Sequence, residues 1–234
     1  MTRPQPQDFD TRRVERLLKA ATGATRAGSR VDIISATLLG KPYQSNPLIG
    51  SAETPEVFTV STDRFDCVTY IETVFALAQS RDARCFFDVL RRIRYADGKV
   101  EWSLRNHYMT EWIRNNVRSG WIRRTSTLSA DVAKDRLLTV VPGLSPRRAK
   151  FHCIPKTTLL RNSDKIETGD LIFFASTRAH LDVFHCGILI RNGHSVLLRH
   201  ASRSKGGVVE QPLEEFLKQN RMAGAIVVRS TESN

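Results

Sequence analysis

The sequence predicts an α+β fold, in which N-terminal helices pack on a C-terminal antiparallel sheet. In the first half of the chain, apolar residues recur at three- and four-residue spacing, as in helices that bury one face. In the last third, short apolar runs of strand length are separated by turn residues. Helices followed by strands are typical of the α+β class. The 234 residues contain no internal repeat and no long linker, so we expect a single domain over residues 1–234.

Five helices are expected before residue 120, from their apolar periodicity and from the glycines between them. Their ranges are 11–21, 29–39, 67–78, 83–93 and 107–117. The first two make residues 1–40 an N-terminal helical extension. Residues 41–56 hold three prolines and are expected to form a loop, followed by a short strand at 57–60. Asp97-Gly98 predicts a hairpin turn.

Five strands and one further helix are expected in the last third of the chain. The strands are predicted at 171–175, 184–190, 196–200, 207–210 and 225–229, and the helix at 212–219.

Charge is distributed unevenly along the chain. Lysine and arginine number 36 against 24 aspartate and glutamate residues, a formal net charge of +12. Residues 90–124 carry half of this excess, with eight arginines and one lysine against three acidic residues. Such a surplus favours polyanionic partners, either nucleic acid or an anionic cell-wall polymer. A solvated basic face with no partner is the alternative.

The apolar runs are too short for a membrane span, because the longest clean ones have strand length. Residues 1–30 are polar and charged, without the apolar stretch of a secretory signal. The chain as given therefore predicts either a cytoplasmic protein or one whose leader was removed.

Four cysteines are spaced widely and irregularly, at Cys67, Cys85, Cys153 and Cys186. No Cys-x-x-Cys pair occurs, so the spacing indicates neither a short disulfide framework nor a local metal site.

Cys67 stands at the beginning of an apolar helix. Asp66 comes directly before it, where a carboxylate can accept hydrogen bonds from the first free N–H groups. In the first helical turn, the positive end of the helix dipole favours the thiolate, which is the nucleophilic form of cysteine. A small buried residue is the alternative interpretation, since free cysteine is often buried. A catalytic cysteine also needs a base.

Two histidines are the candidates for that base. Asn192-Gly193 is a strong signal for a two-residue hairpin turn. With these residues as the turn, paired residue numbers sum to 385 and His185 lies directly opposite His200. Directly opposed side chains have Cβ atoms about 4.5–5.5 Å apart. Gly187, two residues after His185, then lies on the same face and leaves room for another backbone.

These three side chains would follow the logic of a catalytic triad, with the cysteine as nucleophile, one imidazole as its base and the second imidazole to orient the first. A partly exposed cross-strand histidine contact and a zinc site built from Cys67, His185 and His200 stay open as alternatives.

Several motifs together resemble the N-acetylmuramoyl-L-alanine amidase-like family, a branch of the NlpC-type papain-like cysteine hydrolases of bacterial cell walls. They are Asp66-Cys-Val-Thr-Tyr-Ile-Glu72, Gly169-Asp-Leu-Ile-Phe-Phe174 with Asp182-Val-Phe-His-Cys-Gly187, Leu197-Leu-Arg-His-Ala-Ser202 and Arg105-Asn-His-Tyr-Met-Thr-Glu-Trp112. The resemblance implies a papain-like α+β fold that cleaves the amide between N-acetylmuramic acid and L-alanine in peptidoglycan fragments.

The resemblance also implies roles for individual residues. Cys67 would be the nucleophile, His185 the general base and His200 the orienting residue. Candidates for substrate contact are Asp66, Asn106, His107 and Tyr108. Cys186 departs from the family pattern, in which a small aliphatic residue is usual at that position.

Two other functions are compatible with the sequence: a DL-endopeptidase that cuts peptidoglycan stem peptides, and a non-catalytic protein that binds wall polymers or nucleic acid. The expected partners are peptidoglycan fragments rather than nucleic acid, and no cofactor or metal is expected. The resemblance places the protein in the cell envelope or periplasm, whereas the absence of a signal keeps the cytoplasm open. The oligomeric state is not predicted.

Overall fold

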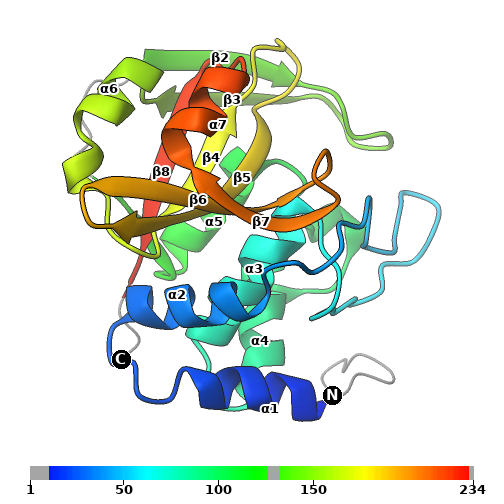
Figure 1. Ribbon diagram of the computed structural model, residues 1–234. Helices are drawn as coiled ribbons and strands as arrows, with labels where there is room; N and C mark the ends of the chain where they lie inside the picture. The colour runs from blue at the N-terminus through cyan, green and yellow to red at the C-terminus, as the bar shows by residue number, and fades with distance from the viewer. Residues whose placement is uncertain (1–10, 126–131, 232–234) are drawn as a thin grey trace.

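A six-stranded antiparallel sheet forms the centre of the computed structural model, which describes residues 11–125 and 132–231. The strand order is β1-β8-β4-β5-β6-β7, and every neighbouring pair is antiparallel. The strands are β1 Ile122–Arg124, β4 Leu171–Ala175, β5 Val183–Asn192, β6 Ser195–Ser202, β7 Gly207–Pro212 and β8 Gly224–Ser230. This arrangement confirms the predicted α+β class with an antiparallel sheet (Figure 1).

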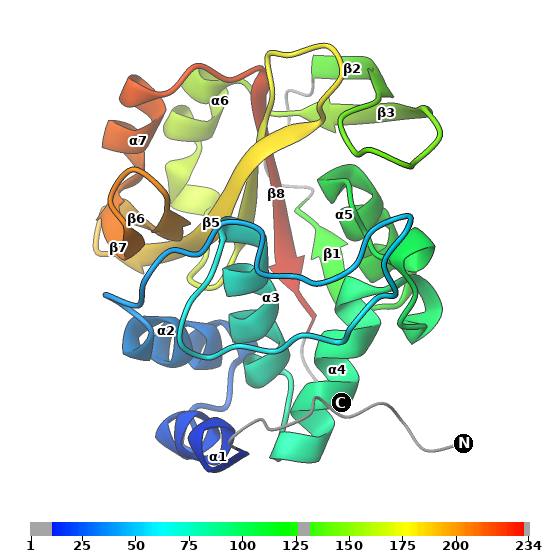
Figure 2. The same ribbon diagram turned by 90° about the vertical axis from the view of Figure 1, so that its right-hand side faces the viewer.

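Helices cover both faces of the sheet (Figures 1 and 2). One face packs on α1 Thr11–Ala20, α2 Ala27–Thr37, α3 Cys67–Ala78, α4 Ala83–Arg94 and α5 Met109–Arg118. The other packs on α6 Lys156–Arg161 and α7 Leu213–Gln219. Three short 3-10 turns, η1 Ala96–Gly98, η2 Trp102–Leu104 and η3 Ser163–Lys165, complete the helical elements of the described residues.

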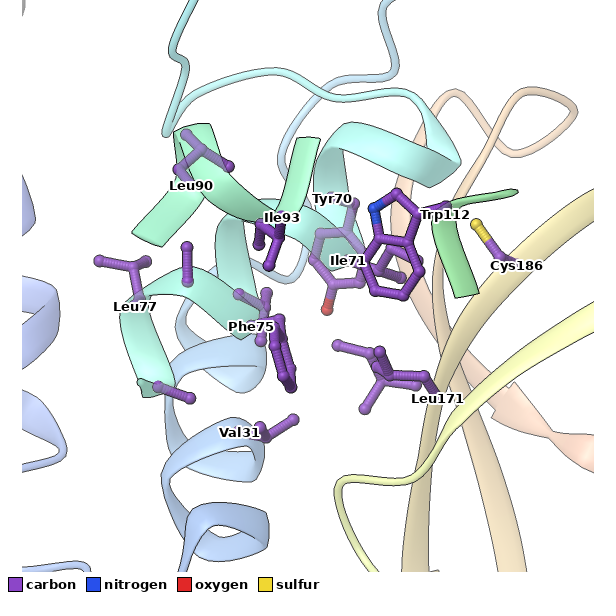
Figure 3. Packing of buried hydrophobic residues seen from close by; sticks show 14 of the residues in the cluster. Val31, Tyr70, Ile71, Phe75, Leu77, Leu90, Ile93, Trp112, Leu171 and Cys186 are labelled. Carbon is purple, nitrogen blue, oxygen red and sulfur yellow. The ribbon is translucent and has the colours of Figure 1, made fainter. Parts of the chain in front are cut away.

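Alternation along the strands separates two apolar clusters, because successive side chains point to opposite faces of a sheet. In β4, Leu171 and Phe173 join the cluster under α3, whereas Ile172 and Phe174 join the cluster under α7. Figure 3 shows the first cluster, in which side chains of α2, α3, α4 and α5 meet those of β4 and β5.

Helix α3 is buried on all sides rather than on one face. Every residue from Thr69 to Ala78 is buried, including Glu72. The Glu72 carboxylate accepts hydrogen bonds from Arg94 Nε at 2.7 Å and from Trp112 Nε1 at 3.1 Å. Arg94 also donates to the Thr59 carbonyl at 2.5 Å. A buried charge pair with further hydrogen bonds therefore joins α3 to α4 and α5.

The β5–β6 hairpin corrects the predicted register. Ile190 pairs with Leu197 and Leu189 with Leu198, so paired numbers sum to 387 rather than 385. The turn residues are Gly193 and His194, with φ of +59° at Gly193. A turn with positive φ at the first central residue alone needs glycine only there. The register therefore moves by two residues, which leaves every side chain on its predicted face.

A predicted strand and a predicted hairpin turn are absent from the described residues, and several elements that the structure contains were not predicted. Residues 57–60 form no strand and contribute only a bridge between Ile49 and Val57. Asp97 and Gly98 have φ of +53° and +65°, but they lie in the short η1 turn and not in a hairpin. The sequence pattern also missed α6, β1 and the two-stranded sheet of β2 Val132–Leu138 with β3 Arg147–Cys153. β2 is charged and largely exposed, so it lacks an apolar alternation.

The two N-terminal helices contribute to the same core as the rest of the chain. Val14 and Ile34 are fully buried in the cluster under the sheet. Arg30 donates hydrogen bonds to the carbonyls of Ala78 and Ser80, both at 2.7 Å. The assignment of residues 1–234 to one domain, with 1–40 as an extension, stays a prediction, and residues 1–10 lie outside the described part. Among the helices described, none has the length and apolar character needed to cross a membrane.

Candidate active site

The nucleophile candidate occupies the first position of α3. Asp66 is the N-cap, and its carboxylate accepts a hydrogen bond from the Thr69 N–H at 2.7 Å. In return, the Thr69 hydroxyl accepts from the Asp66 N–H at 3.0 Å. This capping box confirms the predicted cap and fixes the first turn of the helix. Cys67 therefore lies where the helix dipole stabilises a negative charge.

His185 and His200 lie in contact, as predicted. The distance from His185 Nε2 to His200 Nδ1 is 2.6 Å, and the two rings are nearly perpendicular, at 84°. The contact survives the register correction because a shift of two residues preserves the face. Continued to its end, the observed register places His200 opposite Gly187. A Cβ at Gly187 would lie 3.1 Å from the His200 Cβ and 2.9 Å from the Arg199 carbonyl oxygen. The glycine thus makes room for β6 itself.

Aromatic side chains enclose the two imidazoles. Phe174 stacks nearly parallel to His185, at 10°, and Phe216 lies 5.5 Å from the His185 ring and 5.4 Å from the His200 ring. Burial, followed by the charges of His185 and Lys205, lowers the pKa of His200 to about 3. His200 is therefore a neutral imidazole at physiological pH.

The surroundings of Cys67 favour the thiolate. A hydrogen bond from the Cys186 thiol is the largest influence, and a hydrogen bond and charge from His185 add to it, so the pKa of Cys67 falls well below its usual value despite burial. The Cys67 carbonyl oxygen, 3.3 Å from the Cys186 sulfur, is a second acceptor for the same S–H proton. Because His200 occupies Nε2 of His185, Nδ1 is the ring nitrogen left for Cys67.

Cys186 therefore has a testable electrostatic effect on Cys67. We expect iodoacetamide to alkylate Cys67 at pH values well below the range of a free thiol, whose pKa is about 8.5. Cys186→Ala removes the S–H donor, so it should raise the pKa of Cys67 and move the alkylation midpoint to higher pH. The measurement is the alkylation rate of Cys67 against pH, followed by peptide mapping.

Cys85 offers a matched control for this experiment. It lies in the first turn of α4, where its N–H donates to the capping Asp82 carboxylate at 2.7 Å. Cys85→Ala should leave the Cys67 midpoint unchanged. An unchanged midpoint in Cys186→Ala as well would show that the second thiol does not stabilise the thiolate.

Sequence reasoning missed Tyr43, which lies beside Cys67 and Asp66. Its N–H donates to the Gly206 carbonyl at 2.8 Å, and a bridge joins it to Phe65. Burial, then the charges of Cys67 and Asp66, raise the pKa of the Tyr43 hydroxyl. Burial and the Cys67 charge also raise the pKa of Asp66 to about 6, against the hydrogen bonds from Thr69. The loop that carries Tyr43 has no periodic pattern, so no local signal marked it.

The three substrate candidates of the 105–112 motif make contacts within the protein. The Asn106 amide donates to the Ile93 carbonyl at 3.1 Å, and its oxygen accepts from Asn115 at 2.6 Å. His107 Nε2 lies 2.7 Å from the Trp102 carbonyl oxygen, and burial lowers the pKa of His107. The buried Tyr108 hydroxyl accepts from the Val141 N–H at 3.4 Å. Substrate contact by these residues and by Asp66 stays a prediction.

The same motif anchors the strand that carries His185. The Thr110 N–H and hydroxyl both donate to the Asp182 carboxylate, at 2.7 and 2.8 Å. Asp182 directly precedes β5, so this pair fixes the beginning of α5 against the beginning of the histidine strand.

The arginine-rich stretch is largely committed to ion pairs. Arg94 and Arg105 reach back to Glu72 and Glu56, at 2.7 and 3.1 Å. Four more of its eight arginines lie within 4.0 Å of a carboxylate: Arg91 and Arg92 with Asp88, Arg114 with Glu111, and Arg118 with Asp97. Arg94 and Arg105 are therefore neutralised inside the fold, whereas the side chains of Arg92, Arg114 and Arg118 are 52%, 68% and 64% exposed, so part of the positive charge stays on the surface. In the parts of the chain that the structure describes, no cluster of three or more histidine, cysteine or acidic side chains is arranged to hold a metal ion.

The sequence matches the model of the AmiA-like family, described as N-acetylmuramoyl-L-alanine amidase-like, over residues 33–225. The chain belongs to this family. The matched range of the AmiA-like model includes Cys67, His185 and His200.

Several solved structures share the fold of this chain. An N-acetylmuramoyl-L-alanine amidase from Bacteroides uniformis is 27% identical, with a TM-score of 0.78 over 88% of this chain and 99% of that one. A putative xylanase from Bacteroides fragilis is 26% identical, with a TM-score of 0.73 over 83% of this chain and 98% of that one. A Legionella pneumophila protein of the DUF1460 family shares the fold at 20% identity, with a TM-score of 0.83 over 95% of both chains. Among curated proteins, no relative matches.

Proposed function

We propose that this protein is a cysteine amidase of the NlpC-type papain-like class, which hydrolyses the bond between N-acetylmuramic acid and L-alanine in peptidoglycan fragments. The contact chain from Cys67 through His185 to His200, at the capped end of a buried helix, carries the proposal. Membership of the AmiA-like family and the likeness to the Bacteroides uniformis amidase support the choice of substrate.

In the proposed reaction, the Cys67 thiolate attacks the amide carbonyl carbon on the muramic acid side. The negative charge that develops on the carbonyl oxygen would be stabilised by the Cys67 backbone N–H, one of the first-turn donors that have no partner within the helix. As the C–N bond breaks, the protonated His185 gives a proton from Nδ1 to the leaving amine of L-alanine. The product is a thioester between Cys67 and the muramoyl group.

Water completes the cycle. His185 now accepts a proton from a water molecule, which attacks the thioester and restores the thiolate. His200 stays neutral throughout, because its pKa lies near 3. It orients the His185 ring by accepting the Nε2–H hydrogen bond at 2.6 Å.

Product masses test the proposal directly. Muropeptides and anhydro-muropeptides would be incubated with the wild type and with Cys67→Ala, and the fragments identified by mass spectrometry. An amidase yields a peptide-free sugar and an intact stem peptide that begins with L-alanine. Fragments in which L-alanine is still joined to the sugar would instead identify the DL-endopeptidase. Binding of wall polymer or DNA with no cleavage would favour the non-catalytic alternative. We also propose that the enzyme acts in the cell envelope or periplasm, which fractionation of the native host would test against a cytoplasmic location.

The two histidines should differ in their response to substitution. His185→Ala removes the base, so turnover should fall nearly as far as in Cys67→Ala. The double variant with Cys67→Ala and His185→Ala should be hardly less active than either single variant. His200→Gln keeps a hydrogen-bonding group and should retain partial turnover, whereas His200→Leu should lose much more. Steady-state kinetics on a muropeptide measure these effects. Equal losses in His200→Gln and His200→Leu would contradict the orienting role.

A further inference from the structure

Two complementary polar atoms beside the candidate active site are buried and have no hydrogen-bond partner among residues 11–125 and 132–231. They are Nε2 of His200 and Oε1 of Gln211, in side chains that are 3% and 6% exposed. A buried polar group without a partner is rare enough in proteins to need an explanation. Here one atom belongs to the histidine that contacts His185, and the other is a strong acceptor.

The sheet register brings these two side chains to one face. His200 pairs with Val209 and Leu198 pairs with Gln211, so Gln211 is the diagonal neighbour of His200 on β7. Diagonal neighbours lie about 7–8 Å apart, within the reach of long side chains. The strand order β5-β6-β7 places His200 between His185 and Gln211. Phe216 of α7 packs on the His200 ring at 5.4 Å and belongs to the apolar cluster on this face.

The chemistry of the site requires a particular tautomer of His200. When His185 is the imidazolium, both of its ring nitrogens carry protons, and Nε2–H must donate to Nδ1 of His200. Neutral His200 then carries its only proton on Nε2. The tautomer of a histidine is set by the hydrogen bond that its other nitrogen makes. An acceptor for the Nε2–H would therefore select the state in which His200 can support His185.

We infer that Gln211 is a positioning residue, whose Oε1 receives the Nε2–H of His200 through one bridging water and so holds His200 in the tautomer that accepts the hydrogen bond from Nε2–H of His185. Gln211 does not touch the reacting atoms; it acts through His200. The inference rests on the proposed roles of His185 and His200, and it extends the triad to a fourth, outer residue.

Histidine NMR tests this inference without any turnover. In protein labelled with ¹⁵N at histidine, with His200 assigned by comparison with His200→Gln, the imidazole shifts should show the proton on Nε2. Gln211→Leu, which removes the acceptor at similar volume, should increase the fraction with the proton on Nδ1. Gln211→Glu, which keeps an acceptor, should retain the Nε2–H form. A wild-type His200 with its proton on Nδ1, or an unchanged tautomer in Gln211→Leu, would overturn the inference.

Kinetics on a muropeptide give a second readout. Gln211→Leu should lower kcat by about 10-fold to 100-fold with little change in KM, by analogy with the loss of an outer hydrogen-bond partner of a metal-ligating histidine. Gln211→Glu should restore much of the loss, and Gln211→Leu should cost nothing further in a His200→Leu background. Gln219 is exposed on α7, so Gln219→Leu is the matched control for the change from glutamine to leucine. A loss of kcat that Glu does not rescue, accompanied by a lower melting temperature, would mark a merely structural residue and overturn the inference.

If Gln211→Leu does not fold, Gln211→Met supplies a more flexible apolar replacement, and the wild-type tautomer still decides the question. If the wild type leaves muropeptides intact but Gln211→Leu still changes the His200 tautomer as expected, the proposed substrate is refuted and the positioning role stands.

Discussion

Replacement of Cys67 by alanine is expected to reduce amide cleavage by roughly 10⁴-fold or more, because the neighbouring thiol, Cys186, is fully buried and burial raises its pKa well above the usual value. The same change should leave the free energy of unfolding within about 1 kcal/mol of the wild type, since only the sulfur atom of an incompletely buried residue is lost. Muropeptide turnover and urea denaturation measure the two effects. Cys85→Ala, the matched cysteine at the beginning of α4, should retain full turnover.

The opposite pattern would refute the nucleophile assignment. A Cys67→Ala variant that keeps turnover but loses several kcal/mol of stability would identify a buried structural cysteine, since large losses of that kind follow from core truncation.

The largest expected effect on stability comes from Glu72. Both Glu72 and Arg94 are 2% exposed, and the carboxylate also accepts from Trp112. Glu72→Ala leaves the Arg94 guanidinium buried without its carboxylate, a change that typically costs about 3–5 kcal/mol. Urea denaturation should show a midpoint far below that of the wild type, and activity should fall with the folded fraction.

Two controls show whether the loss of stability comes from a buried unpaired charge. One removes an exposed ion pair, and the other replaces both members of the buried pair by apolar residues. Glu214 and Lys218 form an exposed pair on α7, at 2.8 Å, and Glu214→Ala should leave the midpoint nearly unchanged. The apolar pair Glu72→Leu with Arg94→Met should recover part of the loss, because no unpaired charge remains buried. If Glu72→Ala unfolds at the same urea concentration as the wild type, the pair does not hold α3 to α4.

Much of the catalytic proposal was accessible from short stretches of sequence. The Asp66 cap and Cys67 lie within one helical turn, where capping preference and apolar spacing specify the geometry locally. The sequence predicts the histidine contact with the wrong register, because Asn192 belongs to β5 and the turn residues are Gly193 and His194. The error was harmless because an even shift preserves the face of a strand.

Contacts between distant segments were beyond that kind of reasoning. Tyr43 approaches Cys67 from a loop with no periodic pattern, and Cys186 reaches the Cys67 carbonyl across 119 residues of sequence. The arginine-rich stretch was expected to be an attractive surface. In the fold, Arg94 and Arg105 pair with carboxylates 22 and 49 residues earlier in the chain.

The sequence by itself determined the α+β class, the capped helix that begins at Cys67 and the shared face of His185 and His200, because each depends on periodicity or on residues within a few positions. Only the tertiary structure decided that His185 lies beside Cys67, that Cys186 contributes to the electrostatics of Cys67, and that His200 is buried and neutral. Burial and charge stabilisation depend on which segments pack together, and no local pattern records the packing partners of a segment.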